Sequence, residues 1–97
     1  MSAILDFSIF PLDKGVSLSA YVARALRIVK DSGLPYVFSP MSTSVEGEWD
    51  EVLALVTRCK EELAKDCDRI NVSMRVDWRN GPSGRLSAKI KSVEQKL

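Results

Sequence analysis

The sequence predicts an α+β fold in which a four-stranded antiparallel sheet carries two helices on one face and is followed by an extra C-terminal helix. Two observations predict this fold. The first is the order βαββαβ, in which segments with two-residue apolar alternation are strands and segments with helical spacing are helices. The second is one more helical segment at the end of the chain. Two βαβ units joined by a hairpin interlock in one sheet, and right-handed crossovers place both helices on the same face. The chain has 97 residues, so we expect a single domain that spans residues 1–97.

The first and last predicted strands, residues 3–11 and 69–78, show the clearest alternation. Pro11 ends the first strand, because proline has no backbone N–H to donate to a neighbour. In the last strand Ile70 and Trp78 are expected to face inward, together with the apolar residues between them. The predicted helices would then cover a face built from Leu5, Phe7, Ile9, Val72, Met74 and Val76.

The segment after the first strand predicts a helix and then a hairpin. Apolar residues at helical spacing run over residues 17–32, where Ser17 is a good N-cap and Gly33 closes the helix. Two short strands follow at residues 36–39 and 42–46, and they are close enough in sequence to form a hairpin.

Residues 47–65 predict the second helix. Its first turn is rich in acidic residues, which the positive end of a helix favours, and its apolar stripe from Trp49 to Leu63 is expected to be buried. A last helix is expected over residues 84–97. One side of it is apolar and consists of Leu86, Ile90, Val93 and Leu97.

This order of elements is that of the ferredoxin-like βαββαβ sandwich, whose strands lie in the spatial order 4-1-3-2. The face without helices would be polar, built from Asp6, Ser8, Ser44, Glu46, Asn71, Ser73 and Arg75. Asp6 and Arg75 would lie on neighbouring strands, where opposite charges can pair. The polar face is either solvated, an interface between subunits, or one wall of a small-molecule site.

Composition excludes several functions. The chain has no histidine, so it can form neither a histidine-based catalytic triad nor a histidine metal site, and we expect no metal and no cofactor. Fourteen basic and 13 acidic residues give a net charge of +1, which argues against nucleic acid or a membrane surface as partner. Two cysteines, the absence of a signal-like N-terminus and the lack of a long apolar run predict a cytoplasmic protein.

The stretch Pro40-Met41-Ser42-Thr43, followed by Glu46-Gly47-Glu48-Trp49-Asp50-Glu51-Val52, resembles the thiamine-binding protein family (the MTH1187/YkoF-like group). The resemblance extends over essentially the whole chain. It includes Ser8 with Pro11-Leu12, Tyr21-Val22, Ser32-Gly33-Leu34 and the terminal segment 91–97. Ser42 departs from the family pattern, which has glycine there. The resemblance implies a ferredoxin-like fold, assembly into homodimers or homotetramers through sheet faces and edges, and non-catalytic binding of thiamine or its hydroxymethylpyrimidine part.

Thiamine joins a cationic thiazolium ring to a flat aminopyrimidine, so its site needs negative charge, an aromatic or sulfur surface and hydrogen-bonding groups. The residues that we expect to contact the ligand are Ser8, Tyr36, Met41, Thr43, Glu46 and Trp49. Glu46 would balance the cation, Tyr36 or Trp49 would contact a ring, and the hydroxyl groups would orient its polar edge. Four of these residues also have a purely structural interpretation: Trp49 and Tyr36 in the core, Glu46 at a helix start, and Thr43 as an ordinary strand residue.

Three other functions remain possible at this point. An enzyme could use Asp6 and Glu46 as paired acids, but no nucleophile–base pair, metal cluster or phosphate-binding loop accompanies them. An RNA-binding domain of this fold would carry aromatic side chains on its open sheet face, where this chain has polar ones. A structural or regulatory homo-oligomer without a thiamine-type ligand is the strongest alternative.

Overall fold

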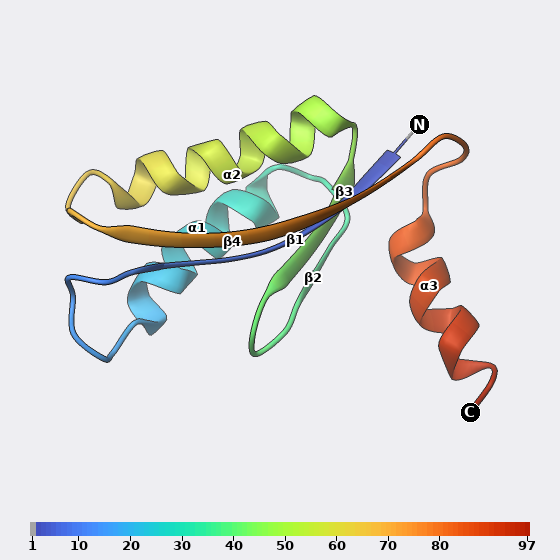
Figure 1. Cartoon of the computed structure of the whole chain (residues 1–97), viewed down its shortest axis with the longest axis horizontal. Coiled ribbons are helices and arrows are strands. Elements are labelled where there is room, and N and C mark those ends of the chain that lie inside the picture. The colour runs from blue at the N-terminus through green and yellow to red at the C-terminus, as the bar shows by residue number, and fades with distance from the viewer. Residues whose placement is uncertain (1) are drawn as a thin grey trace.

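The structure, a computed structural model, describes residues 2–97 and confirms the ferredoxin-like fold (Figure 1). Its elements are β1 (Ser2–Pro11), α1 (Ser19–Asp31), β2 (Tyr36–Phe38), β3 (Thr43–Gly47), α2 (Trp49–Leu63), β4 (Ile70–Arg79) and α3 (Arg85–Glu94). The four strands form one antiparallel sheet in the order β2-β3-β1-β4, as predicted. β1 and β3 are therefore the central strands, and β2 and β4 are the edges.

Strand register separates the two faces of the sheet. Leu5 of β1 lies opposite Val45 of β3, which lies opposite Tyr36 of β2, so these three side chains share the face that α1 and α2 cover. Asp6 lies opposite Ser44 on the other face. The core on the helix side consists of Ala3, Leu5, Phe7, Ile9, Ala25, Val29, Val45, Val52, Leu55, Val56, Cys59, Leu63 and Cys67.

Both long helices begin later than the sequence predicts. α1 starts at Ser19 with Leu18 as its N-cap, so Ser17 does not cap it. α2 starts at Trp49, because the carboxylate of Glu51 accepts the backbone N–H of Glu48 at 2.9 Å and completes a capping box. The acidic residues expected in the first turn therefore set the helix start itself.

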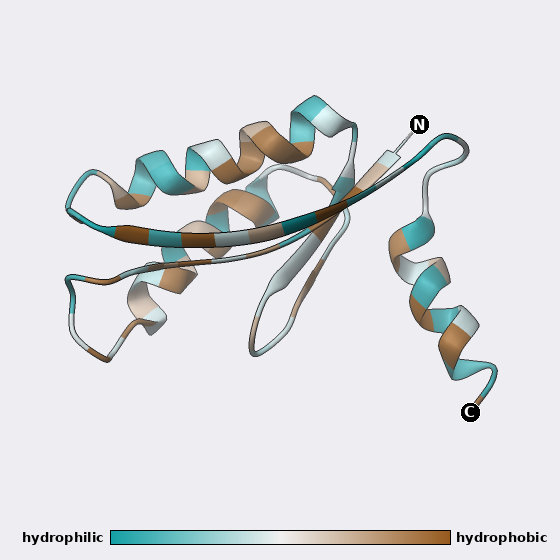
Figure 2. Ribbon diagram, in the orientation of Figure 1, coloured by the Kyte–Doolittle hydropathy of each residue, from teal (hydrophilic) through white to brown (hydrophobic). Residues whose placement is uncertain are grey.

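The prediction that Met74, Trp78 and Trp49 are buried is wrong. Met74 and Trp78 are 51% and 50% exposed, and Trp49 is also exposed. The apolar alternation of β4 is present in Figure 2, and Ile70, Val72 and Val76 pack against the core as predicted, although they are only partly buried. β4 is an edge strand, and its Met74 and Trp78 stay half exposed. Alternation identifies which side chains share a face, and the position of the strand decides whether that face is covered.

α3 lies at the end of the molecule that carries the N-terminus, apart from α1 and α2 (Figure 1). It ends at Glu94, short of the predicted end. Leu86 is the apolar residue of its stripe that is buried, whereas Ile90, Val93 and Leu97 are exposed. The apolar side of α3 is thus largely uncovered.

Gly33 follows the C-cap of α1 with φ +78°, a left-handed conformation that costs a residue with a Cβ about 1 kcal/mol. Gly33→Ala should therefore lower the free energy of unfolding by about 1 kcal/mol, measured by urea denaturation. Gly33→Asn should lose less, because asparagine tolerates this conformation better. Equal losses in the two variants would contradict this explanation.

Candidate functional site

A pocket of about 290 Å³ lies between α1 and the tip of the β2–β3 hairpin, beside the second half of β1. This volume is at the lower end of the range of small-molecule sites, about 300–1,000 Å³. The pocket is lined by Phe7, Ser8, Ile9 and Phe10 of β1, by Leu18, Val22, Ala25, Leu26 and Val29 of α1 and its N-cap, and by the hairpin residues 38–43.

The pocket exists because β1 is longer than its partner β3. Pairing between the two strands ends at Phe7 and Thr43, whereas β1 continues to Pro11. Within residues 2–97, no strand pairs with the β3-facing edge of β1 beyond Phe7. Backbone N–H and C=O groups at this edge can therefore bind a ligand.

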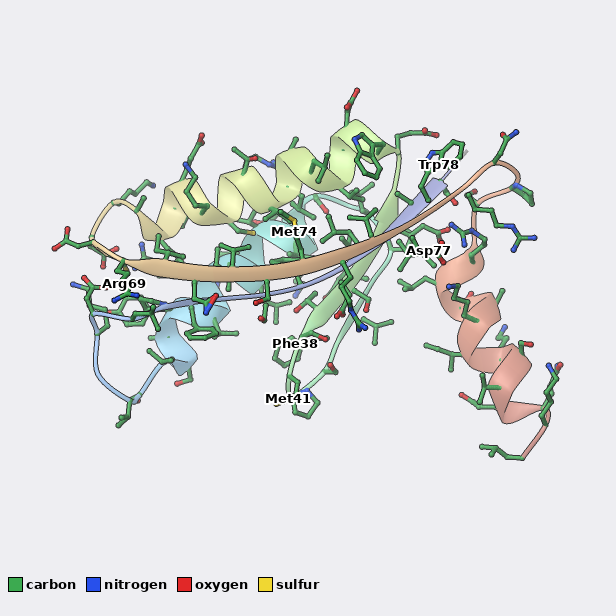
Figure 3. All side chains as sticks on the ribbon, in the orientation of Figure 1. Phe38, Met41, Arg69, Met74, Asp77 and Trp78 are labelled. Atoms are coloured by element: carbon green, nitrogen blue, oxygen red, sulfur yellow. The ribbon has the colours of Figure 1, made fainter. Side chains whose placement is uncertain are left out.

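The pocket lining combines apolar and aromatic surface with hydroxyl groups. Phe10 and Phe38 supply aromatic rings, and Figure 3 places Phe38 and Met41 toward the tip of the hairpin. The hydroxyl-bearing residues are Ser8, Ser39, Ser42 and Thr43. None of the lining residues in the described part of the chain is charged. Such a lining suits a flat, uncharged ring with a few hydrogen-bonding groups.

Two of these hydroxyl groups donate their protons within the protein. Ser39 Oγ donates to the backbone oxygen of Ser42 at 2.8 Å, and Ser42 Oγ donates to Asp6 Oδ1 at 2.8 Å. Ser44 Oγ donates to the same Asp6 oxygen at 2.9 Å. A hydroxyl has one proton, so Ser39 and Ser42 can only accept further hydrogen bonds.

Asp6 also meets Arg75 as expected, with 3.6 Å between Arg75 Nη2 and Asp6 Oδ2. Asp6 therefore links β1 to the start of β3 through the hydroxyl groups of Ser42 and Ser44. It also contacts β4 through the guanidinium of Arg75. Ser42 uses its hydroxyl to hold the hairpin to β1 at the edge of the pocket.

The six residues predicted to contact a ligand divide into two groups. Ser8, Met41 and Thr43 line the pocket. Tyr36, Glu46 and Trp49 lie outside its lining. Tyr36 pairs with Val45 and is partly exposed, and Trp49 lies at the start of α2. Glu46 lies about 10 Å along β3 from Thr43, at the opposite end of that strand.

Glu46 is only 3% exposed and serves the N-terminus of α3. Its carboxylate oxygens accept the backbone N–H groups of Arg85 at 3.0 Å and Leu86 at 3.3 Å. Burial raises the pKa of Glu46, but hydrogen bonds from the backbone of Arg85, Leu86 and Gly84 and from the Ser2 side chain together outweigh burial and hold that pKa below its ordinary value. The buried guanidinium of Arg85 in turn donates to the backbone oxygen of Ser2 and contacts Asp77.

Sequence reasoning missed Phe38, Ser39, Ser42 and the α1 side of the pocket as site residues. The predicted strand lengths already differ: the strand over residues 3–11 is longer than its predicted neighbour over residues 42–46. The longer strand must extend past its neighbour, and the uncovered part leaves room beside the connecting hairpin. The α1 residues form an ordinary apolar stripe, so the sequence does not separate those that line a pocket from those that fill the core.

Other kinds of site find little support in the described residues. Within residues 2–97, no three His, Cys, Asp or Glu side chains are grouped closely enough to hold a metal ion. Across the same range, no helix combines the length and the apolar character that crossing a membrane requires. Burial raises the pKa of the Cys59 thiol to about 11, so this cysteine is a protonated, unreactive thiol at neutral pH.

Comparison with known proteins shows to which family this chain is related. A family model described as "Thiamine-binding protein" matches residues 5–94. A UPF0045 protein of Mycobacterium bovis is 39% identical over 98 residues, covering 100% of this chain and 96% of that protein. The crystal structure of a Methanocaldococcus jannaschii protein superposes with a TM-score of 0.87 at 30% identity and covers 96% of each chain.

A structure from Thermotoga maritima, of a protein proposed to act in thiamine biosynthesis or salvage, shares the fold. Its TM-score is 0.79 at 20% identity, and the match covers 94% of this chain and 99% of that one. The family model spans nearly the whole chain, and full-length relatives exceed 30% identity. This chain therefore belongs to the thiamine-binding protein family.

Proposed function

We propose that this protein binds thiamine or a related aminopyrimidine without catalysing a reaction, and that the pocket between α1 and the hairpin is the binding site. One observation carries the proposal. The family match over residues 5–94 includes every residue that lines the pocket, so the part of the chain that carries the resemblance also forms the cavity.

The lining favours the pyrimidine half of the ligand. A flat ring would fit between Phe38 and the apolar side of α1, and an exocyclic amino group can donate to the hydroxyl oxygens of Ser39 or Ser42. Ser8, Met41 and Thr43 are further contacts in this proposal. The cationic thiazolium would point toward the exposed side chain of Met41 at the mouth, where water solvates the charge. Glu46 makes no ligand contact in this arrangement.

Isothermal titration calorimetry with thiamine, hydroxymethylpyrimidine and oxythiamine tests the proposal. Thiamine should bind saturably with a micromolar dissociation constant, and hydroxymethylpyrimidine should bind within about tenfold of it. Oxythiamine carries an oxo group in place of the amino group. It should bind at least about tenfold more weakly, because its oxo oxygen accepts hydrogen bonds and the hydroxyl oxygens of Ser39 and Ser42 can also only accept them. Heats equal to dilution for all three compounds would contradict the proposal.

We further propose that the protein is a cytoplasmic homodimer or homotetramer. The exposed apolar side chains of α3 and β4 support assembly, and the two free cysteines support a reducing compartment. The same exposed surfaces favour the second candidate function, a structural or regulatory oligomer without a thiamine-type ligand. That function predicts a defined oligomer with no heat of binding in the titration above.

A further inference from the structure

Asp6 lies next to the pocket without lining it. Its carboxylate oxygen Oδ1 accepts the hydroxyl proton of Ser42, which is a lining residue, at 2.8 Å. The strand register fixes the position of Asp6, because this residue lies opposite Ser44 on β3 and opposite Arg75 on β4. The Asp6 side chain is only 26% exposed, so the contact with Ser42 is partly shielded from water. A charged group outside the pocket therefore reaches a hydroxyl group inside it.

The chemistry of Asp6 leaves the Ser42 hydroxyl a single orientation. A carboxylate has no proton to give, so both hydroxyls that meet Asp6 Oδ1 must donate, Ser42 at 2.8 Å and Ser44 at 2.9 Å. Arg75 meets the other oxygen, Oδ2, at 3.6 Å and leaves Oδ1 to the two serines. A hydrogen bond to a charged acceptor is stronger than one between neutral groups, so a neutral polar group of a ligand does not turn the Ser42 proton away from Asp6. Ser42 therefore presents only lone pairs to the pocket.

Ser39 is the other lining serine whose proton is fixed, and a different kind of group fixes it. Its hydroxyl donates to the backbone oxygen of Ser42 at 2.8 Å, within the hairpin. A side-chain substitution cannot remove a backbone oxygen, whereas it can remove the carboxylate that holds the Ser42 proton. Substitution of Asp6 thus frees the Ser42 proton and leaves the acceptor of the Ser39 proton in place. The contributions of the two serines to ligand choice can therefore be separated.

We propose that Asp6 is a positioning residue that sets the ligand specificity of the pocket. By holding the Ser42 proton, it makes the pocket select a heterocycle whose polar edge carries an N–H donor over one that carries an acceptor at the same place. This inference rests on the proposed function, because it concerns how the pocket distinguishes among ligands. Asp6 acts through Ser42 and touches no ligand itself. An exocyclic amino group donates to Ser42 Oγ, whereas an oxo group there would face the Ser42 lone pairs with no proton between the two oxygens.

The ratio of the oxythiamine dissociation constant to the thiamine dissociation constant measures this specificity, and titration calorimetry gives it for each variant. For wild type the ratio should be at least about ten. In Asp6→Ala the Ser42 hydroxyl can turn and donate to an oxo oxygen. Oxythiamine should then bind at least about fivefold more tightly than it binds wild type, while the thiamine affinity should change less than about threefold. Ser42→Ala removes the hydroxyl and keeps Asp6, and its ratio should fall below about three.

Two variants serve as matched controls. Ser44→Ala removes the second donor to the same carboxylate oxygen, at a position outside the pocket lining. Arg75→Ala removes the guanidinium that meets the other oxygen of Asp6. Both variants keep the bond between Ser42 and Asp6, so both should retain the wild-type ratio to within about twofold. A loosened hairpin would weaken the two ligands alike, so the ratio reports the Ser42 proton and not the stability of the fold.

The outcomes separate this inference from the proposed function. If wild type binds thiamine and either Asp6→Ala or Ser42→Ala keeps the wild-type ratio, the role of Asp6 is overturned and the proposed function stands. A wild-type ratio near one would overturn it as well. A ratio that falls in Ser39→Ala and not in Asp6→Ala would assign the selection to Ser39. Absence of thiamine binding by wild type would overturn the proposed function, and this inference with it. Urea denaturation of each variant in parallel shows that the titrated protein is folded.

Discussion

Glu46→Ala should lower the free energy of unfolding by about 2–3 kcal/mol at neutral pH, because it removes a charged acceptor of two hydrogen bonds. The carboxylate is buried and receives the backbone N–H groups of Arg85 and Leu86. Without it, the first turn of α3 loses its two backbone hydrogen bonds to β3, and the positive end of the helix loses a compensating charge. Urea denaturation followed by circular dichroism measures the loss.

The same contact predicts a pH dependence. The folded-state pKa of Glu46 lies below its ordinary value, so its contribution to stability is fully present above the unfolded pKa of about 4.3. That contribution is lost as the pH falls through the folded pKa. Glu46→Gln keeps the shape but not the charge, so the stability gap between wild type and this variant should be largest at neutral pH and shrink below about pH 4.

Glu61→Gln is the matched control, because Glu61 is an exposed acid of α2. It should change stability little and leave the pH dependence unaltered. A Glu46→Gln variant as stable as wild type at neutral pH, or a gap that stays constant down to pH 3, would show that Glu46 does not hold α3.

Val22→Trp should weaken thiamine binding at least about tenfold, because the indole occupies the space that a pyrimidine ring needs. Val22 lies on α1, lines the pocket and is only half-buried, so the larger side chain can enter the cavity without crossing the core. The pocket holds about 290 Å³, at the lower end for a small-molecule site, so a larger side chain takes up space that a ligand would use. Titration calorimetry of the folded variant, with stability measured in parallel, gives the result.

Val93→Trp on α3 is the control for this variant. It adds the same side chain at an exposed position outside the pocket and should leave the affinity unchanged. Undiminished thiamine affinity in Val22→Trp would place the ligand elsewhere on the molecule, and the polar face around Asp6 would become the next surface to test.

The secondary-structure elements of this protein and their order follow from local patterns in its sequence. Apolar residues alternate along β1 and recur at helical spacing along α1 and α2. Such a local pattern is enough to assign a strand or a helix. The order of elements together with the handedness of crossovers then determined the strand order. The contact between Asp6 and Arg75 was one possibility that the strand order allowed, and the register of β1 and β4 places the two residues opposite each other.

Which residues form a site depends instead on how the elements pack together. Thr43 and Glu46 are three positions apart on one strand, yet Thr43 lines the pocket and Glu46 holds α3. Alternation in the sequence places them on opposite faces of the sheet, but it does not give their roles, because each role depends on what packs beside the strand at that point. The exposure of Met74 and Trp78 has the same origin: periodicity assigns a side chain to a face, but only the packed elements determine whether that face is covered.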